Sequence, residues 1–192
     1  MFGLRNLFNK KETPVGFFER NRTAEEREAT AYHEAGHAIL AILKPSFTEL
    51  DYVTIKCDEE NLGNVAMKIP EKLVSTSKTV LENAIMQDLA GYAAEEIVFG
   101  YVEEETYSGD YDRAITMADQ LIENGFTDIS SRDQILEIML LETKKFLLDH
   151  RPILDNVAQD LLLYETLPSQ NIQNIINSGL QNSEQYLSAD RD

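Results

Sequence analysis

Three residues in the first quarter of the chain have the types and the spacing of a metal-binding catalytic motif. His33 and His37 are four residues apart, and Glu34 follows the first of them, so the stretch reads H-E-x-x-H. On a helix, residues four apart lie one turn from each other on the same face, so both imidazoles can bind one tetrahedral Zn²⁺. The adjacent glutamate can then take a proton from a water molecule that the metal activates. The motif predicts hydrolysis of an amide bond, and two structural histidines with a solvated glutamate are the alternative.

The sequence around the motif predicts a helix over residues 24–43 that would position these side chains. Thr23 and Glu26 form a capping-box pattern, and Pro45 lies just beyond the end of the run. The apolar stripe consists of Tyr32, Gly36, Ile39 and Leu43, and the two histidines lie along its flank. Glycine costs about 1 kcal/mol relative to alanine inside a helix, so we expect a close neighbour at Gly36.

Composition limits the class of protein. The 192 residues suit one domain, and 17 Lys and Arg against 34 Asp and Glu give a net charge of −17. That charge argues against nucleic-acid binding, which needs a basic surface. Cys57 is the only cysteine, which rules out an intrachain disulfide and favours a reducing compartment, the cytoplasm. No apolar run approaches the ~20 residues of a membrane-spanning helix.

Three parts are expected along the chain. Residues 1–22 are predicted to be a flexible N-terminal arm, 23–180 the folded domain, and 181–192 a polar, disordered tail. Apolar and basic residues between positions 2 and 11 would allow weak contact with a membrane surface.

A β-hairpin is expected after the motif helix. Residues 50–57 are rich in β-formers, 61–63 carry a turn signal, and 65–69 read as a second short strand before Pro70. An extended peptide could pair with the free edge of such a hairpin, and a purely structural hairpin is the alternative. The residues that would hold a peptide are Gly63, Asn64, Val65, Ala66 and Met67.

A helix is predicted over residues 79–99, closed by Gly100. Its apolar stripe consists of Ile85, Leu89, Tyr92, Ala93 and Ile97. Glu96 falls within this stripe and Glu95 at its edge. A buried carboxylate needs a partner, which could be a metal, a metal-bound histidine or the cation of a salt bridge.

The rest of the chain is predicted to be helical. Asp110 opens a helix over 110–124, where Ala114 and Ala118 form a small face against which another element would pack closely. Asp110 and Asp112 both suit the N-terminal dipole of that helix, so the residues alone do not assign either of them to a metal. A capping-box pattern at Ser131 to Gln134 predicts the start of one further helix, and Pro152 predicts the start of another. A short helix is expected after Pro168 and ends at Gly179.

Several blocks in this order resemble the peptidase domain of the FtsH family of ATP-dependent zinc metalloproteases. The blocks are AYHEAGHAILAIL (31–43), the VTI strand with Leu62-Gly63, LAGYAAEEIVFG (89–100), the helix that begins at Asp110, and LLETKKFLLDHRPILDNVAQDLLLYETLPSQNI (140–172). The resemblance covers about residues 24–178. It implies a mainly α (α+β) fold, a helical zinc-metallopeptidase domain with a small β-hairpin beside the HExxH helix.

The resemblance also implies roles for individual residues. His33 and His37 match the zinc ligands, Glu34 matches the general base, and Asp110 matches the third ligand. The alanines four and eight residues after Asp110 fit the family spacing, which Asp112 does not. Glu95 and Glu96 match an acidic pair behind the ligands, and Glu96 as third ligand is the alternative.

The chain lacks the AAA+ module, the membrane anchor and any G-x-x-x-x-G-K-[ST] pattern, so no ATPase activity of its own is expected. We therefore predict a stand-alone zinc metalloendopeptidase for flexible or unfolded polypeptides. An AAA+ ATPase in trans could deliver its substrates, and the resemblance implies a homo-oligomer, a hexamer. The alternative is a zinc-binding adaptor or assembly module with a peptidase fold but no turnover.

Overall fold

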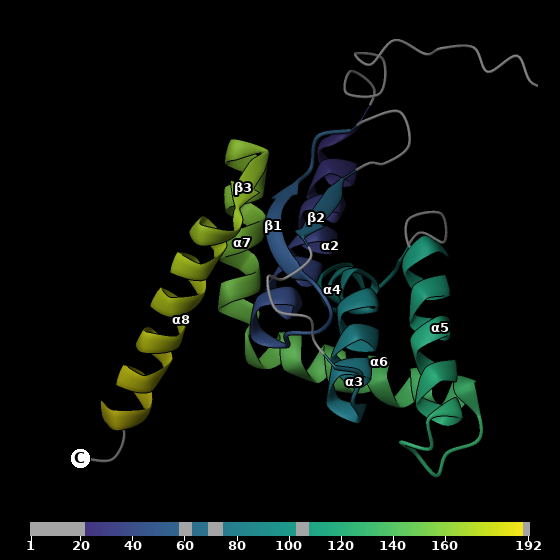
Figure 1. Ribbon diagram of the computed structural model, residues 1–192. Coiled ribbons are helices and arrows are strands. Elements are labelled where there is room, and N and C mark those ends of the chain that lie inside the picture. The colour runs from purple at the N-terminus through teal and green to yellow at the C-terminus, as the bar shows by residue number, and fades with distance from the viewer. Residues whose placement is uncertain (1–21, 58–62, 69–74, 103–107, 190–192) are drawn as a thin grey trace, which may run out of the picture.

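The computed structural model describes residues 22–57, 63–68, 75–102 and 108–189. Within these ranges the chain is mainly helical, with a small antiparallel sheet, so the predicted fold class is confirmed (Figure 1). The elements in chain order are α2 (Ala24–Leu43), β1 (Glu49–Thr54), β2 (Asn64–Lys68), α3 (Lys78–Asp88), α4 (Ala90–Phe99), α5 (Ser108–Glu123), α6 (Arg132–Asp149), α7 (Arg151–Tyr164), β3 (Thr166–Pro168) and α8 (Ser169–Ala189). The predicted arm, except for its last residue, and most of the predicted turn lie outside the described residues.

The motif helix α2 has the predicted bounds and lies at the centre of the fold. The Thr23 hydroxyl accepts the N–H of Glu26 at 3.1 Å, and the Glu26 carboxylate accepts the N–H of Thr23 at 2.6 Å, which confirms the capping box. The helix packs against α4, α7 and β1. A Cβ at Gly36 would lie 2.5 Å from the carbonyl oxygen of Ala90, which is the close neighbour that the sequence predicts.

The sheet has the strand order β2-β1-β3, and both pairs are antiparallel. Val53 of β1 lies opposite Val65 on one side and Leu167 on the other. The strand β2 therefore forms one edge of the sheet and runs beside α2. The predicted first strand is shorter than expected, since β1 ends at Thr54. The sequence did not predict β3, because three residues are too few to show an alternating pattern.

The helix predicted over 79–99 is in fact two helices. Leu89 separates α3 from α4 with φ −84° and ψ −5°, which departs from the α-helical ψ near −42°. The break directs Gly91 of α4 against α2. The helical phase does not carry across the break, so Glu95 is the buried member of the acidic pair, 3% exposed, and Glu96 is only half-buried.

Of the C-terminal helices, α7 and α8 pack against the motif helix, whereas α6, at the bottom of Figure 1, packs against α4 and α5. Pro152 lies in the first turn of α7, as predicted, whereas Ser131 forms only one half of the predicted capping box. The helix α8 runs through Gly179 to Ala189, so the helix end predicted at Gly179 is wrong. Position 179 lies inside the helix and takes a glycine because a Cβ there would be 2.5 Å from Cγ1 of Ile153.

One apolar core joins α2 to the other elements. Its largest fully buried side chains are Ile39, Leu40, Val53, Ile55, Leu81, Ile85, Leu147, Leu154, Leu161, Leu167, Ile172 and Ile176. Ala114 and Ala118 of α5 are fully buried, as expected from the small face of that helix. No helix in the described ranges is both long and apolar enough to cross a membrane.

Candidate metal centre

Three side chains from two helices meet at one point in the structure. Nε2 of His33 and Nε2 of His37 are 3.1 Å apart, and they lie 3.2 Å and 3.1 Å from Oδ2 of Asp110. The histidines come from successive turns of α2, and Asp110 comes from the first turn of α5. In the part of the chain that the structure describes, these residues form the one group of three or more potential ligands that could share a metal ion.

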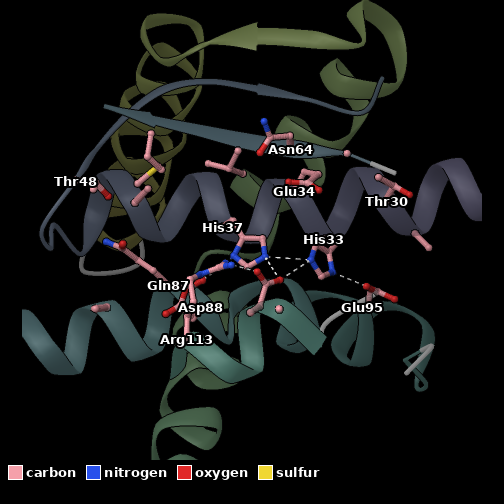
Figure 2. A pocket seen from close by; sticks show the side chains of 18 of the residues that line it. Thr30, His33, Glu34, His37, Thr48, Asn64, Gln87, Asp88, Glu95 and Arg113 are labelled. Carbon is pink, nitrogen blue, oxygen red and sulfur yellow. Dashed lines mark hydrogen bonds and ion pairs between the residues drawn. The ribbon is translucent and has the colours of Figure 1, made fainter. Parts of the chain in front are cut away.

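The other ring nitrogen of each histidine has its own hydrogen bond, and Figure 2 shows the one between His33 and Glu95. Nδ1–H of His33 donates to Oε1 of Glu95 at 2.6 Å, and Nδ1–H of His37 donates to the backbone carbonyl of Gln87 at 2.7 Å. These two bonds place the protons of the neutral rings on Nδ1, so both Nε2 atoms can act as ligands. The donor set of two imidazoles and one carboxylate fits Zn²⁺ and leaves a fourth tetrahedral position open.

Electrostatics holds the three ligands together. Burial opposes the charged form of His33, but hydrogen bonds with Asp110 and Glu95 outweigh it and raise the pKa of His33 to about 10. Burial likewise opposes a charged His37, and Asp110 outweighs it, so the pKa of His37 is raised. Burial alone would raise the pKa of Asp110, yet the two imidazoles hold it well below its ordinary value. A divalent cation at this point would replace the protons that the imidazoles share with Asp110.

Glu34 lies on the side of α2 that faces β2, whereas the histidines point toward α4 and α5 (Figure 2). Its side chain is buried, and burial raises the pKa of its carboxyl group, although His33 and His37 oppose this. A Cβ at Gly63 would lie 2.6 Å from Oε1 of Glu34, so the chain at the start of β2 passes directly over this carboxylate.

Both members of the predicted acidic pair have a partner, but only one of them contacts a ligand. Glu95 receives the hydrogen bond of His33, whereas Oε2 of Glu96 lies 2.6 Å from Nζ of Lys144. The structure therefore does not bring Glu96 to the histidines, either as a third ligand or behind one. This is the salt bridge that the sequence left open, and it follows from the shift of helical phase at the break before α4. Asp112 is exposed and lies outside the ligand group.

The ligands line a cleft of about 1070 Å³ that extends along β2. Of the residues predicted to hold a peptide, four line this cleft and Ala66 does not. The four are Gly63, Asn64, Val65 and Met67.

Sequence reasoning missed four residues that support the site. Gln87 contributes a backbone carbonyl, which every residue type has, so no sequence signal could identify it. Gly91 gives His33 room, because a Cβ there would lie 2.4 Å from the His33 ring. Arg113 donates to Oδ1 of Asp110 and, through Nε, to Oδ1 of Asp88 at 2.9 Å. The i, i+3 spacing of Asp110 and Arg113 is the signal that could have indicated this contact.

A helical domain whose H-E-x-x-H helix meets a distant aspartate defines the class of HExxH metal-dependent hydrolases. Comparison with known proteins gives the family. Residues 20–132 match the model of peptidase family M41. The chain belongs to this family, as its resemblance to the FtsH peptidase domain predicts.

The similar curated proteins are FtsH proteases. ATP-dependent zinc metalloprotease FtsH 2 of Phytoplasma mali (strain AT) is 29% identical over 181 residues, which cover 81% of this chain and 26% of the relative. FtsH 1 of Alkaliphilus metalliredigens (strain QYMF) is 31% identical over 179 residues, or 81% of this chain and 30% of the relative. FtsH 1 of Sorangium cellulosum (strain So ce56) is 27% identical, with 80% and 30% covered. The chain thus spans less than a third of the length of these relatives.

Proposed function

We propose that this chain is a zinc metalloendopeptidase domain that hydrolyses peptide bonds in flexible or unfolded polypeptides. His33, His37 and Asp110 hold Zn²⁺ through Nε2, Nε2 and Oδ2. The observation that carries the proposal is the meeting of these three atoms, all within 3.2 Å of one another, beside the glutamate of the same motif. The printed names of the relatives, which are zinc metalloproteases, support it.

In this proposal Glu34 is the general base. Bound zinc supplies Lewis acidity, which polarises the scissile carbonyl and acidifies the attacking water. Glu34 accepts a proton from that water and passes it to the leaving amine. Glu95 and the Gln87 carbonyl keep both imidazoles in the tautomer that presents Nε2.

Within the described part of the chain, β2 leaves one edge of the sheet unpaired, and this edge supports a binding mode for the substrate. A peptide in extended conformation would pair with this edge through backbone hydrogen bonds, with its side chains in the cleft. Asn64, Val65 and Met67 line the cleft beside the ligands, so a peptide on this edge would pass the metal centre. Backbone pairing of this kind requires an unfolded segment, which is why we propose flexible or unfolded substrates.

The relatives are named ATP-dependent. We therefore include in the proposal an AAA+ ATPase that unfolds and delivers substrates, and a homo-oligomer, a hexamer by family resemblance. The single cysteine supports the cytoplasm as the compartment. Sedimentation analysis of the full chain tests the oligomeric state.

The experiment compares zinc content and digestion of unfolded casein for the wild type and Glu34→Gln. We expect both proteins to bind one equivalent of zinc and only the wild type to cleave casein. Zinc binding without turnover in the wild type would contradict the peptidase proposal and favour an adaptor or assembly module. Zinc lost from Glu96→Ala but kept by Asp110→Ala would contradict the ligand assignment.

A further inference from the structure

Two charged side chains, Arg113 and Asp88, follow one another behind the candidate ligand Asp110, and Figure 2 labels both. One oxygen of Asp110, Oδ2, faces the two histidines, and the other, Oδ1, accepts a hydrogen bond from Nη2 of Arg113. Nε of the same guanidinium donates to Oδ1 of Asp88 at 2.9 Å. Arg113 thus binds two carboxylates at once, and only one of them faces the metal centre.

This arrangement connects two helices. Asp88 is the last residue of α3, whereas Asp110 and Arg113 lie one turn apart on α5, and the two helices pack against each other. An arginine whose guanidinium is held at two points has few rotamers left. The carboxylate of Asp110 is therefore held in one orientation by its own helix and by its neighbour.

The two carboxylates of this contact are largely buried, although the guanidinium that joins them is exposed. The side chains of Asp88 and Asp110 are 16% and 17% exposed, and that of Arg113 is 59% exposed. Among the described residues, Arg113 is the one Lys or Arg within ion-pairing distance of either carboxylate. Largely buried carboxylates need such a partner.

The charges also explain why two acids share one cation. A guanidinium beside a zinc site repels a divalent cation, which by itself would weaken binding. Asp88 cancels that charge while it holds Arg113 in place. The pair can then orient Asp110 without a net electrostatic cost to the metal.

We propose that Arg113 and Asp88 are positioning residues of the metal centre, which hold Asp110 as a ligand through one oxygen only. The inference rests on the proposed zinc site. Arg113 occupies Oδ1, so Oδ2 alone is available to the metal. A carboxylate that bound through both oxygens would crowd the open position that a catalytic zinc site needs.

The test measures zinc affinity of the full chain by competition with a chelator. We expect Arg113→Met to bind zinc about ten- to a hundredfold more weakly than the wild type, as is usual when a partner of a ligand is removed. Arg113→Lys keeps the charge but cannot span both carboxylates, so it also binds more weakly. Asp88→Asn alone should also weaken zinc binding relative to the wild type. The double variant Asp88→Asn/Arg113→Met should bind zinc no more weakly than Arg113→Met alone.

Arg132→Met is the matched control, because Arg132 also pairs with an aspartate of α5, Asp119 at 3.3 Å, but lies outside the cleft. Its zinc affinity should equal that of the wild type. The visible spectrum of the Co²⁺-substituted protein should lose the intensity of a tetrahedral site in Arg113→Met and keep it in Arg132→Met. Both metal-free variants should keep the helical circular dichroism of the wild type.

The outcomes separate this inference from the proposed function. If the wild type binds zinc and Arg113→Met binds it with equal affinity, the inference is overturned and the proposed zinc site stands. A metal-free Arg113→Met protein that loses the helical circular dichroism kept by Arg132→Met overturns it too, since Arg113 would then have a general structural role. A wild type that binds no zinc contradicts both.

Discussion

The two sides of the motif helix are built in different ways. On the side that faces α4 and α5, His33 and His37 are held by directional hydrogen bonds to Glu95, Gln87 and Asp110. On the side that faces β2, within the described residues, no hydrogen bond ends on the carboxylate of Glu34. Its position there is set by close contacts, since a Cβ at Gly63 would lie 2.8 Å from its Cγ.

This difference suits the two proposed tasks. A metal ligand must stay in one tautomer and one orientation, which hydrogen bonds to the second ring nitrogen provide. A general base must exchange protons with water and substrate, so permanent hydrogen bonds would compete with its task. Substitutions on the two sides should therefore separate metal binding from turnover.

The largest effect is expected on the metal side. His37→Ala should weaken zinc binding by roughly 10²- to 10³-fold, because the ~10–16 kcal/mol of a zinc site is shared among about four ligands. Casein cleavage should fall with zinc occupancy. His150→Ala is the control, since His150 instead donates to the Phe146 carbonyl and stacks on the Phe146 ring at 4.3 Å. Competition with a chelator measures the zinc affinity of both variants, and equal affinities would contradict the assignment of His37 as a ligand.

The next effect tests the other side of the helix. In Gly63→Ala the new methyl group would meet Oε1 of Glu34 at 2.6 Å and Cγ2 of Thr30 at 2.8 Å, so the carboxylate must move. A displacement of about 1 Å can cost about a hundredfold in rate, and we expect this loss in kcat/KM with zinc affinity unchanged.

Gly109→Ala is the matched glycine control in the same cleft. Among the described residues its Cβ would meet only Nη1 of Arg113 at 3.9 Å, an ordinary contact, so its kcat/KM should stay near the wild-type value. If Gly63→Ala lost zinc as well as activity, the two sides of α2 would not be independent.

How far the sequence predicts the structure also differs between these sides. The capping box and the proline near the far end fixed the bounds of α2, and the H-E-x-x-H spacing placed both histidines on one face. Gly36 correctly indicated a close neighbour, because a helix tolerates an interior glycine only for a reason. These are local signals, which periodicity and capping rules can read.

The remainder depended on tertiary contacts. The break at Leu89 has no proline or glycine at its own position, so periodicity predicted α3 and α4 as one helix. It therefore placed Glu96 on the buried face, where the structure has Glu95. The strand β3 exists because α7 returns the chain to β1. The Gln87 carbonyl and the Asp88–Arg113 pair become visible only once α3 and α5 pack together.

A smaller effect would refine the description of the metal side. Glu95→Gln keeps an acceptor for Nδ1 of His33 but removes the charge that favours this proton. We expect zinc affinity to fall by about tenfold, at the mild end of the range for partners of a ligand. Glu96→Gln is the control, because Glu96 pairs with Lys144 away from the ligands. A larger loss of zinc in Glu96→Gln than in Glu95→Gln would contradict the observed partners.

The smallest effect concerns the substrate edge beside Glu34. Met67 lines the cleft and is 36% exposed, whereas its neighbour Lys68 does not line it. Met67→Asn should raise KM for an unfolded substrate about fivefold, since it removes about 1 kcal/mol of apolar contact. Its kcat and zinc affinity should not change, and Lys68→Asn should leave all three values unaltered. If Lys68→Asn raised KM as much as Met67→Asn, the peptide would not bind along the cleft side of β2, and the base side of the helix would have to receive its substrate in another way.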